Sequence, residues 1–256
     1  MQKTAIVILL LLVLVFPTGA MELSADDILD RVEGEMAFTG DGTAVIELIT
    51  VNPKGLQRKH DLKVWRKEDP DETSKQLLEY LTPPDVRGTK FLSITPPEGD
   101  ASMWLYLPAL GRERRIAGHA TKDTFMGTDF TYEEIGGSRD FTKEYKAKRL
   151  PDETFDDYLC YVLELSPAAD GAEYGLVKMW VWQDEFLPLQ IQFFDQGLEQ
   201  SKVLVNRNIK EAAGRPTPHE ITMENTLKKT KTIINLLEVE EVELPDDLFS
   251  LRQLRR

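Results

Sequence analysis

A long succession of short strand-like segments, separated at close intervals by Gly, Pro, Asn and Asp, extends through this chain from residue 43 to residue 236. In several segments apolar and polar residues alternate, as around Ile221 and Met223. Alternation with a period of two is typical of a strand with one buried face and one solvated face. Because no regular exchange of strands with helices interrupts the series, the pattern predicts a single antiparallel sheet, curved or closed.

The expected strands cover residues 43–51, 57–67, 76–81, 90–95, 103–107, 112–116, 141–150, 158–166, 177–182, 188–195, 199–205, 208–213, 218–225 and 229–236. The strands at 103–107 and 177–182 are apolar on both faces, so each needs a second cover. The candidates are an N-terminal helix, the segment around residues 125–132, or a ligand. The tail at 244–249 predicts a small helix or turn, docked by Leu248 and Phe249.

An amphipathic helix is expected before the first strand. Ser24 is a helix-capping residue, and the two Asp residues after it lie in the first turn, where the helix dipole favours negative charge. Ile28, Leu29, Val32 and Met36 then recur at helical spacing. A short helix with one apolar face has to lay that face on the sheet.

The first 20 residues have the features of a secretory signal peptide. A short positive start is followed by an apolar run at 5–16 and by small residues up to Ala20, near which cleavage is expected. The apolar run is too short to span a membrane. We therefore expect residues 21–256 to be exported as one domain.

The formal net charge of −13 argues against nucleic acid and against anionic lipid surfaces as partners. Cys160 is the only cysteine, so no internal disulfide can form, and its strand-like surroundings predict a buried, inert thiol. The three His residues are scattered, which predicts no metal site, and no phosphate-binding or nucleophile motif suggests a cofactor or an enzyme. A hydrolase assembled from distant carboxylates stays open as an alternative.

The aromatic residues are more numerous than one ordinary face needs. Ordinary core packing is one interpretation; a concave apolar pocket, made adaptable by methionines, is the other. The candidate lipid-binding residues are Trp104, Tyr106, Phe125, Met126, Phe130, Tyr132, Met179, Trp180, Trp182, Ile191 and Phe193. Arg87, Arg112 and Arg115 are candidates for contact with a headgroup or a partner at the rim. In the 103–107 strand either Trp104 and Tyr106 or their neighbours face the pocket, and the pattern does not decide which.

Three ordered motifs carry a family resemblance: TPPDVRGTKFL at 82–92, MWLYLPALGR at 103–112 and FMGTDFTYE at 125–133. Together they resemble the outer-membrane lipoprotein-sorting protein family (LolA-like). The resemblance implies a mainly β fold: an incomplete, strongly curved antiparallel β-barrel covering an N-terminal helix and a lid segment. We expect the N-terminal helix and residues 125–132 to form this lid.

The resemblance also implies a function. It suggests a monomeric, non-enzymatic periplasmic carrier that shields lipid or lipoprotein acyl chains in an apolar cavity and passes them toward the outer membrane. The subgroup that the chain most resembles includes companions of inner-membrane RND-type lipid exporters, so such an exporter is an expected partner. The alternative is a lipid-sensing or adaptor module of the same fold, working with an exporter or an envelope signalling partner.

Overall fold

The computed structural model describes residues 22–36, 41–137 and 139–256; the expected signal peptide lies outside these ranges. The strands are β1 (Gly42–Val51), β2 (Gln57–Glu68), β3 (Ser74–Tyr80), β4 (Lys90–Thr95), β5 (Ser102–Leu107), β6 (Arg112–Ile116), β7 (Tyr145–Phe155), β8 (Tyr158–Pro167), β9 (Leu176–Trp182), β10 (Pro188–Phe194), β11 (Gln200–Ala212), β12 (Arg215–Asn225) and β13 (Thr230–Glu241). The helices are α1 (Ala25–Met36), α2 (Tyr132–Gly136), α3 (Phe141–Glu144) and α4 (Leu251–Leu254), with 3₁₀ turns η1 (Pro108–Leu110), η2 (Gly118–Lys122) and η3 (Asp246–Phe249).

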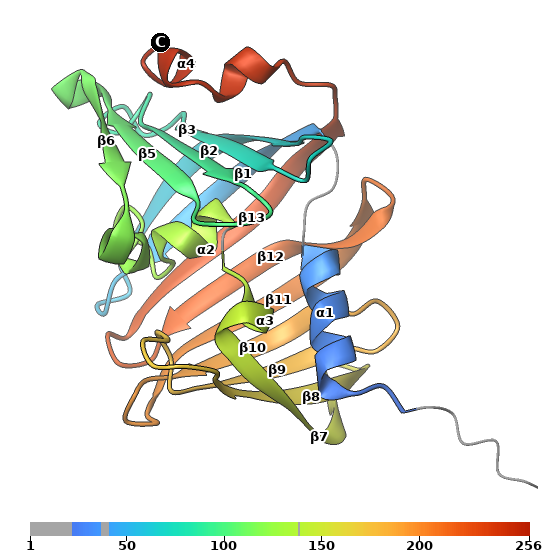
Figure 1. The fold of residues 1–256 in the computed structure, drawn as a ribbon. Coiled ribbons are helices and arrows are strands. Elements are labelled where there is room, and N and C mark those ends of the chain that lie inside the picture. Colours follow the sequence, from blue (N-terminus) through green and yellow to red (C-terminus); the bar gives the residue numbers. More distant parts are fainter. Residues whose placement is uncertain (1–21, 37–40, 138) are drawn as a thin grey trace, which may run out of the picture.

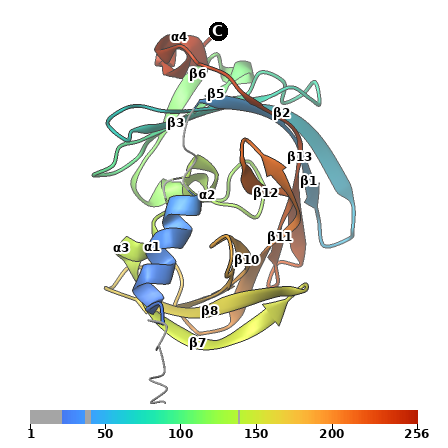
Figure 2. The same cartoon turned by 90° about the vertical axis from the view of Figure 1, so that its right-hand side faces the viewer.

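All these strands belong to one antiparallel sheet, in the order β6-β5-β4-β3-β2-β1-β13-β12-β11-β10-β9-β8-β7. The first and last strands, β1 and β13, pair in the middle of the sheet, with Ile49 opposite Ile233. We call β1–β6 the N-terminal half and β7–β13 the C-terminal half. β6 and β7 are the two edges, so the sheet curls strongly without closing, and α1 and α2 lie inside the curl (Figure 1, Figure 2). The predicted incomplete antiparallel barrel with a helical cover is confirmed.

The structure differs from the sequence-based expectation in three local features. The strand expected from residue 141 begins at Tyr145, because the Asp140 carboxylate accepts hydrogen bonds from two backbone N–H groups and starts α3 instead. The two strands expected at 199–205 and 208–213 are one strand, β11, in which Asn208 takes a left-handed conformation with φ 54°. The helix α2 was not expected, although Thr131 and Glu134 form a capping box at its start.

The concave face of the sheet carries two apolar clusters. In the N-terminal half, β1–β6 contribute buried residues that include Leu62, Phe91 and Leu105. In the C-terminal half, β7–β12 contribute residues that include Met179 and Phe193, and α1 packs against them. Both clusters also contain residues from the segment between β6 and β7, which therefore lies inside the curl.

The convex face of the N-terminal half is covered by the C-terminal tail. Phe249 and Leu254 are buried there against Leu77 and Leu92, and Leu248 packs alongside. The predicted docking of this tail is confirmed, and Figure 1 shows it lying outside the sheet. The second cover that the doubly apolar β5 requires is thus provided by the chain itself.

Cys160 is fully buried on the convex side of the C-terminal half, as expected. Burial raises the pKa of its thiol to about 11, which keeps the thiol protonated and unreactive at neutral pH. Among the residues that the structure describes, no helix is both long and apolar enough to cross a bilayer.

Replacing Phe249 with Ala is expected to lower the free energy of unfolding by about 3–5 kcal/mol, because the buried ring leaves a cavity between the tail and the sheet. Urea denaturation followed by circular dichroism measures this change. Leu251→Ala, at an exposed position in the same tail, is the control and should change stability by less than about 0.5 kcal/mol. Equal effects of the two substitutions would show that the tail is not docked through Phe249.

Candidate functional site

Residues 118–136, which we call the plug, fill the space inside the curl between the two halves of the sheet. Phe125 and Tyr132 pack with Phe91 in the N-terminal half, with ring centroids of Phe125 and Phe91 5.3 Å apart. Phe130 instead belongs to the cluster of the C-terminal half, together with α1. The plug therefore joins two apolar surfaces that the sheet itself keeps apart.

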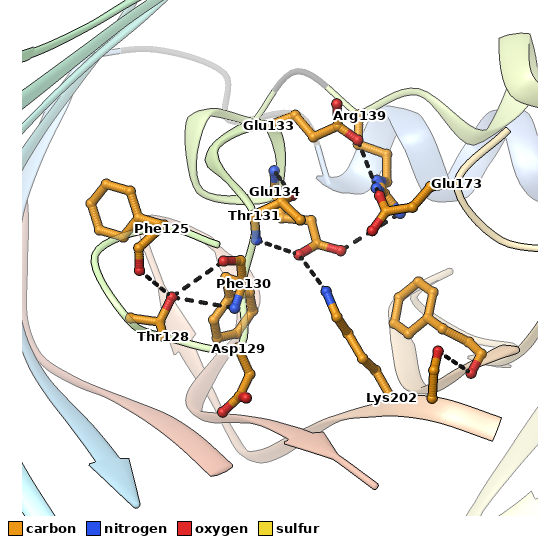
Figure 3. Close-up of polar contacts among 12 residues, drawn as sticks. Phe125, Thr128, Asp129, Phe130, Thr131, Glu133, Glu134, Arg139, Glu173 and Lys202 are labelled. Carbon is orange, nitrogen blue, oxygen red and sulfur yellow. Dashed lines mark hydrogen bonds and ion pairs between the residues drawn. The ribbon is translucent and has the colours of Figure 1, made fainter. Parts of the chain in front are cut away.

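A tight turn shapes the tip of the plug. Met126 and Gly127 have φ values of 46° and 79°, which define a type I′ turn. The Phe125 N–H donates to the Phe130 carbonyl at 2.8 Å, and the Thr128 hydroxyl donates to the Phe125 carbonyl at 2.7 Å (Figure 3). A left-handed conformation costs a residue with a side chain about 1–2 kcal/mol. Docking of the neighbouring aromatic rings has to compensate for this strain at Met126.

Asp129 fastens the plug to the middle of the sheet. Its carboxylate accepts hydrogen bonds from the hydroxyls of Thr230 and Thr232 on β13, the latter at 2.8 Å, and its N–H donates to Thr232 Oγ1 at 2.8 Å. Both Asp129 and Thr232 are buried. These hydrogen bonds satisfy the buried Asp129 carboxylate and fix the position of Phe130 next to it.

A second set of polar contacts, which we call the ion cluster, ties α2 to the C-terminal half (Figure 3). Arg139 Nη2 lies 2.7 Å from Glu133 Oε1 and also contacts Glu173, whereas Lys202 Nζ of β11 lies 3.6 Å from Glu134 Oε2. All five side chains are largely buried. Burial opposes the charge on Arg139, but Glu134, Tyr174, Glu173 and Glu133 outweigh it and hold the Arg139 pKa well above its ordinary value.

The other side of α2 rests on the N-terminal half. Gln76 Nε2 of β3 donates to the Ile135 carbonyl at 2.6 Å. Gly136 lies so close to β4 and β5 that a Cβ there would be 3.0 Å from both Ser93 Oγ and Met103 Cε. The plug is thus attached at three places: to β3–β5, to β13 and to β11.

Helix α1 covers the concave face of the C-terminal half. The predicted cap is present, since Ser24 Oγ accepts from the Asp27 N–H at 3.1 Å. Ile28, Leu29 and Val32 are buried against the sheet as expected, whereas the side chain of Met36 lies outside the described residues. Together, α1 and the plug are the cover expected from the sequence.

Glu33 joins α1 to α3. Its Oε1 accepts from the Phe141 N–H at 2.8 Å. Burial raises the Glu33 pKa to about 7, although the hydrogen bond from Phe141 and the charge of Lys143 lower it; Asp140 and Glu144 raise it further. The charge on Glu33 therefore opposes the docking of α1 at neutral pH.

The structure divides the candidate lipid-binding residues between the two faces of the sheet. Six of them are buried on the concave side: Phe125, Phe130, Tyr132, Met179, Ile191 and Phe193. Met126 is half-buried beside them. Trp104 and Tyr106 instead lie on the convex face under the tail, and Trp180 and Trp182 lie on the convex face near Cys160. These four side chains do not line the concave face, because the residues alternating with them do.

Arg87, Arg112 and Arg115 are exposed, but only the first two lie at the same end of the sheet. Sequence reasoning missed Arg139, Lys202, Glu173 and Glu33, which no motif marks. Asp129 lies within the 125–133 motif, although nothing in the sequence indicates its partners on β13.

Most of the concave face is covered by the plug and α1. Two cavities are present in the described part of the chain. One of about 790 Å³ lies between the start of α1 and β7, at the border of the concave face, and one of about 400 Å³ lies beside the β1–β2 and β12–β13 turns. Within the same residues, no group of three His, Cys, Asp or Glu side chains could hold a metal ion. A ligand that contacts the buried residues of the concave face has to displace the plug or α1.

Comparisons with known proteins agree with this architecture. A family model described as "Uncharacterized protein" matches residues 72–256. The chain is 27% identical to a domain described as an outer membrane lipoprotein-sorting protein from Vibrio parahaemolyticus, covering 91% of this chain and 98% of that one with a TM-score of 0.82. A DUF1329 family protein from Desulfovibrio piger is 25% identical, with 90% and 99% coverage and a TM-score of 0.82.

A LolA superfamily protein from Nitrosomonas europaea shares the fold at 21% identity, with 89% and 98% coverage and a TM-score of 0.67. No curated protein matches the chain. The expected LolA-like architecture is therefore confirmed by solved structures that span almost the whole chain.

Asp129→Ala is expected to lower the free energy of unfolding by about 2–4 kcal/mol, since it removes hydrogen bonds to a charged group and leaves the buried Thr232 hydroxyl without its acceptor. Urea denaturation measures the change. Asp123→Ala, which removes an exposed carboxylate from the same segment, is the matched control and should have little effect. If both variants are as stable as the parent protein, Asp129 does not anchor the plug.

The raised pKa of Glu33 predicts that the free energy of unfolding depends on pH. Because its pKa is about 7 in the folded protein and 4.5 without burial, the folded state binds more protons between these values, and stability falls as the pH rises through this window. Glu33→Gln keeps the acceptor for Phe141 and should remove up to about 3 kcal/mol of this decline. Unfolding free energies of both proteins, measured from about pH 4 to pH 8, give the difference. Parallel curves would exclude a buried, protonated Glu33.

Proposed function

We propose, from the premise that this chain belongs to the family matched over residues 72–256 and is LolA-like, that it is a carrier of lipid or lipoprotein acyl chains. One observation carries the proposal: an apolar, aromatic concave face is covered by a segment that belongs to neither half of the sheet. That segment, the plug, is attached through buried aromatic side chains, side-chain hydrogen bonds and ion pairs. A cover of this kind can leave without breaking the sheet.

The free energies of burial favour replacement of the plug by an acyl chain. Burying Phe125, Phe130 and Tyr132 contributes roughly 5–9 kcal/mol at about 1.5–3 kcal/mol for each ring. An acyl chain with about 14 methylenes contributes about 11 kcal/mol at 0.8 kcal/mol for each CH₂. One chain therefore contributes more than the aromatic contacts that it replaces, and a second chain adds a similar amount.

The proposed carrier works in the periplasm as a monomer, catalyses no reaction, and moves its cargo toward the outer membrane. An inner-membrane RND-type exporter is the proposed donor. The leader that would direct export lies outside the described residues, so this part of the proposal rests on the sequence pattern at 1–20.

A second function, a lipid-sensing or adaptor module, is supported by one observation. β6 is an edge strand with exposed Arg112, Arg114 and Arg115, and its outer edge is available for pairing with an acidic strand of another protein. Native mass spectrometry separates the two functions. Stoichiometric lipid on the purified protein supports the carrier, and lipid-free protein bound to an acidic partner supports the adaptor.

If the protein is such a carrier, a covalent link between the plug and the sheet should prevent acyl chains from binding. A Cβ at Gly136 would lie 3.3 Å from Ser93 Cβ, close to the separation that a disulfide requires. In a Ser93→Cys/Gly136→Cys variant, the oxidised protein should lose most of its binding of a fluorescent fatty acid, and reduction should restore it. Cys160 is buried and protonated, so it does not compete for the new bridge.

The reduced form of the same variant is the internal control for any effect of the two substitutions. Mass spectrometry after alkylation establishes that the bridge has formed. Equal fatty-acid binding before and after reduction would show that α2 does not have to move, and the proposed exchange would then be wrong.

A further inference from the structure

Four hairpin connections of the N-terminal half and its neighbour β13 meet along one rim of the sheet, on the left in Figure 1. They are residues 52–56, 81–89, 108–111 and 226–229, and we call them the tip rim. Pairing of Val51 with Lys231 places the first beside the last. The Arg58–Asp85 ion pair joins the first to the second, and Pro108 lies against Gly88 to join the second to the third.

Each connection of the tip rim exposes one leucine. The exposed fractions are 65% for Leu56, 37% for Leu81, 60% for Leu110 and 48% for Leu227. A fifth, Leu198, is 61% exposed on the neighbouring β10–β11 turn. Single exposed leucines are ordinary, but one on each successive tip of the same rim is a pattern that the core does not require.

The charge of the tip rim is opposite to that of the chain. Its four connections contain Lys54, Arg87, Lys228 and Lys229 but one carboxylate, Asp85, which is paired with Arg58. The chain as a whole has a net charge of −13. The net negative charge of the whole chain therefore does not exclude binding of this rim to anionic lipid surfaces. The adjoining 195–199 turn, with Asp195 and Glu199, marks where the basic region ends.

We propose that the tip rim docks on the surface of a lipid bilayer that contains anionic headgroups. Separate leucines on short turns can enter the boundary between headgroups and acyl chains, while lysines and arginines on the same turns contact phosphates. A protein partner would instead require a contiguous, well-packed apolar centre. On the tip rim, turn residues such as Asn52, Pro84 and Gly111 separate the leucines.

The tip rim is also the end of the sheet at which the plug turns. Asp129 bonds Thr230, the first residue after the 226–229 connection, and the Phe125 ring stacks on Tyr80, directly before the 81–89 connection, at 6.4 Å. Docking brings the Met126–Gly127 turn toward the bilayer. This step rests on the proposed carrier function; the docking itself does not.

Flotation of the protein with lipid vesicles tests the proposal. We expect binding to phosphatidylcholine vesicles that contain phosphatidylglycerol, weaker binding to phosphatidylcholine alone, and release by salt. Leu56→Ser/Leu110→Ser/Leu227→Ser should reduce the partition coefficient by about tenfold or more. Lys54→Glu/Lys228→Glu/Lys229→Glu should abolish the preference for phosphatidylglycerol.

The control is Leu159→Ser/Leu237→Ser, which removes two exposed leucines on β8 and β13 that lie away from the tip rim. It should bind vesicles as the parent protein does. Failure of the parent protein to bind either vesicle, equal losses in the two leucine variants, or binding only when a membrane protein is added to the vesicles would each overturn the proposal. Vesicle binding without fatty-acid binding would support the docking surface and reject the carrier.

Discussion

Because the sheet stays open between β6 and β7, its apolar concave face has to be shielded from water by other parts of the chain. Helix α1 shields the C-terminal half, and the plug fills the space between the halves. The Asp129 carboxylate and the two hydroxyls of β13 fix the plug where the first and last strands meet. The positions of Phe125 and Phe130 on opposite sides of the curl follow from that attachment.

The plug combines strong apolar contacts with polar contacts of small net value. A buried ion pair contributes little to stability, because the loss of hydration offsets most of the attraction between the charges. The ion cluster therefore specifies where α2 lies more than it stabilises the closed state. The strained turn at Met126 further lowers the stability of this segment relative to the strands around it. Such a balance suits a cover that an acyl chain can replace.

The sequence was sufficient for the meander, α1 and the docked tail, because alternation and capping are local signals. The sequence did not show which side chains of β5 lie on the concave face of the sheet, because Trp104 and Leu105 are both apolar. Trp104 lies on the convex face because the C-terminal tail, some 140 residues further on, packs against it there. The ion cluster could not be predicted either, because Lys202 and Glu134 come from distant segments without a shared motif. The net negative charge of the chain also did not indicate the basic tip rim, because its lysines and arginines lie in separate turns.

Hydrogen exchange in the plug, measured on lipid-free and lipid-loaded protein, shows whether an acyl chain replaces the plug. In the lipid-free state the amides of Phe125 and Thr128 are hydrogen-bonded inside the curl and should exchange slowly. Loading should accelerate exchange across residues 118–136 while the amides of β4 and β13 remain protected. If the plug is equally protected in lipid-loaded protein, the cargo does not replace it, and the proposed exchange is wrong.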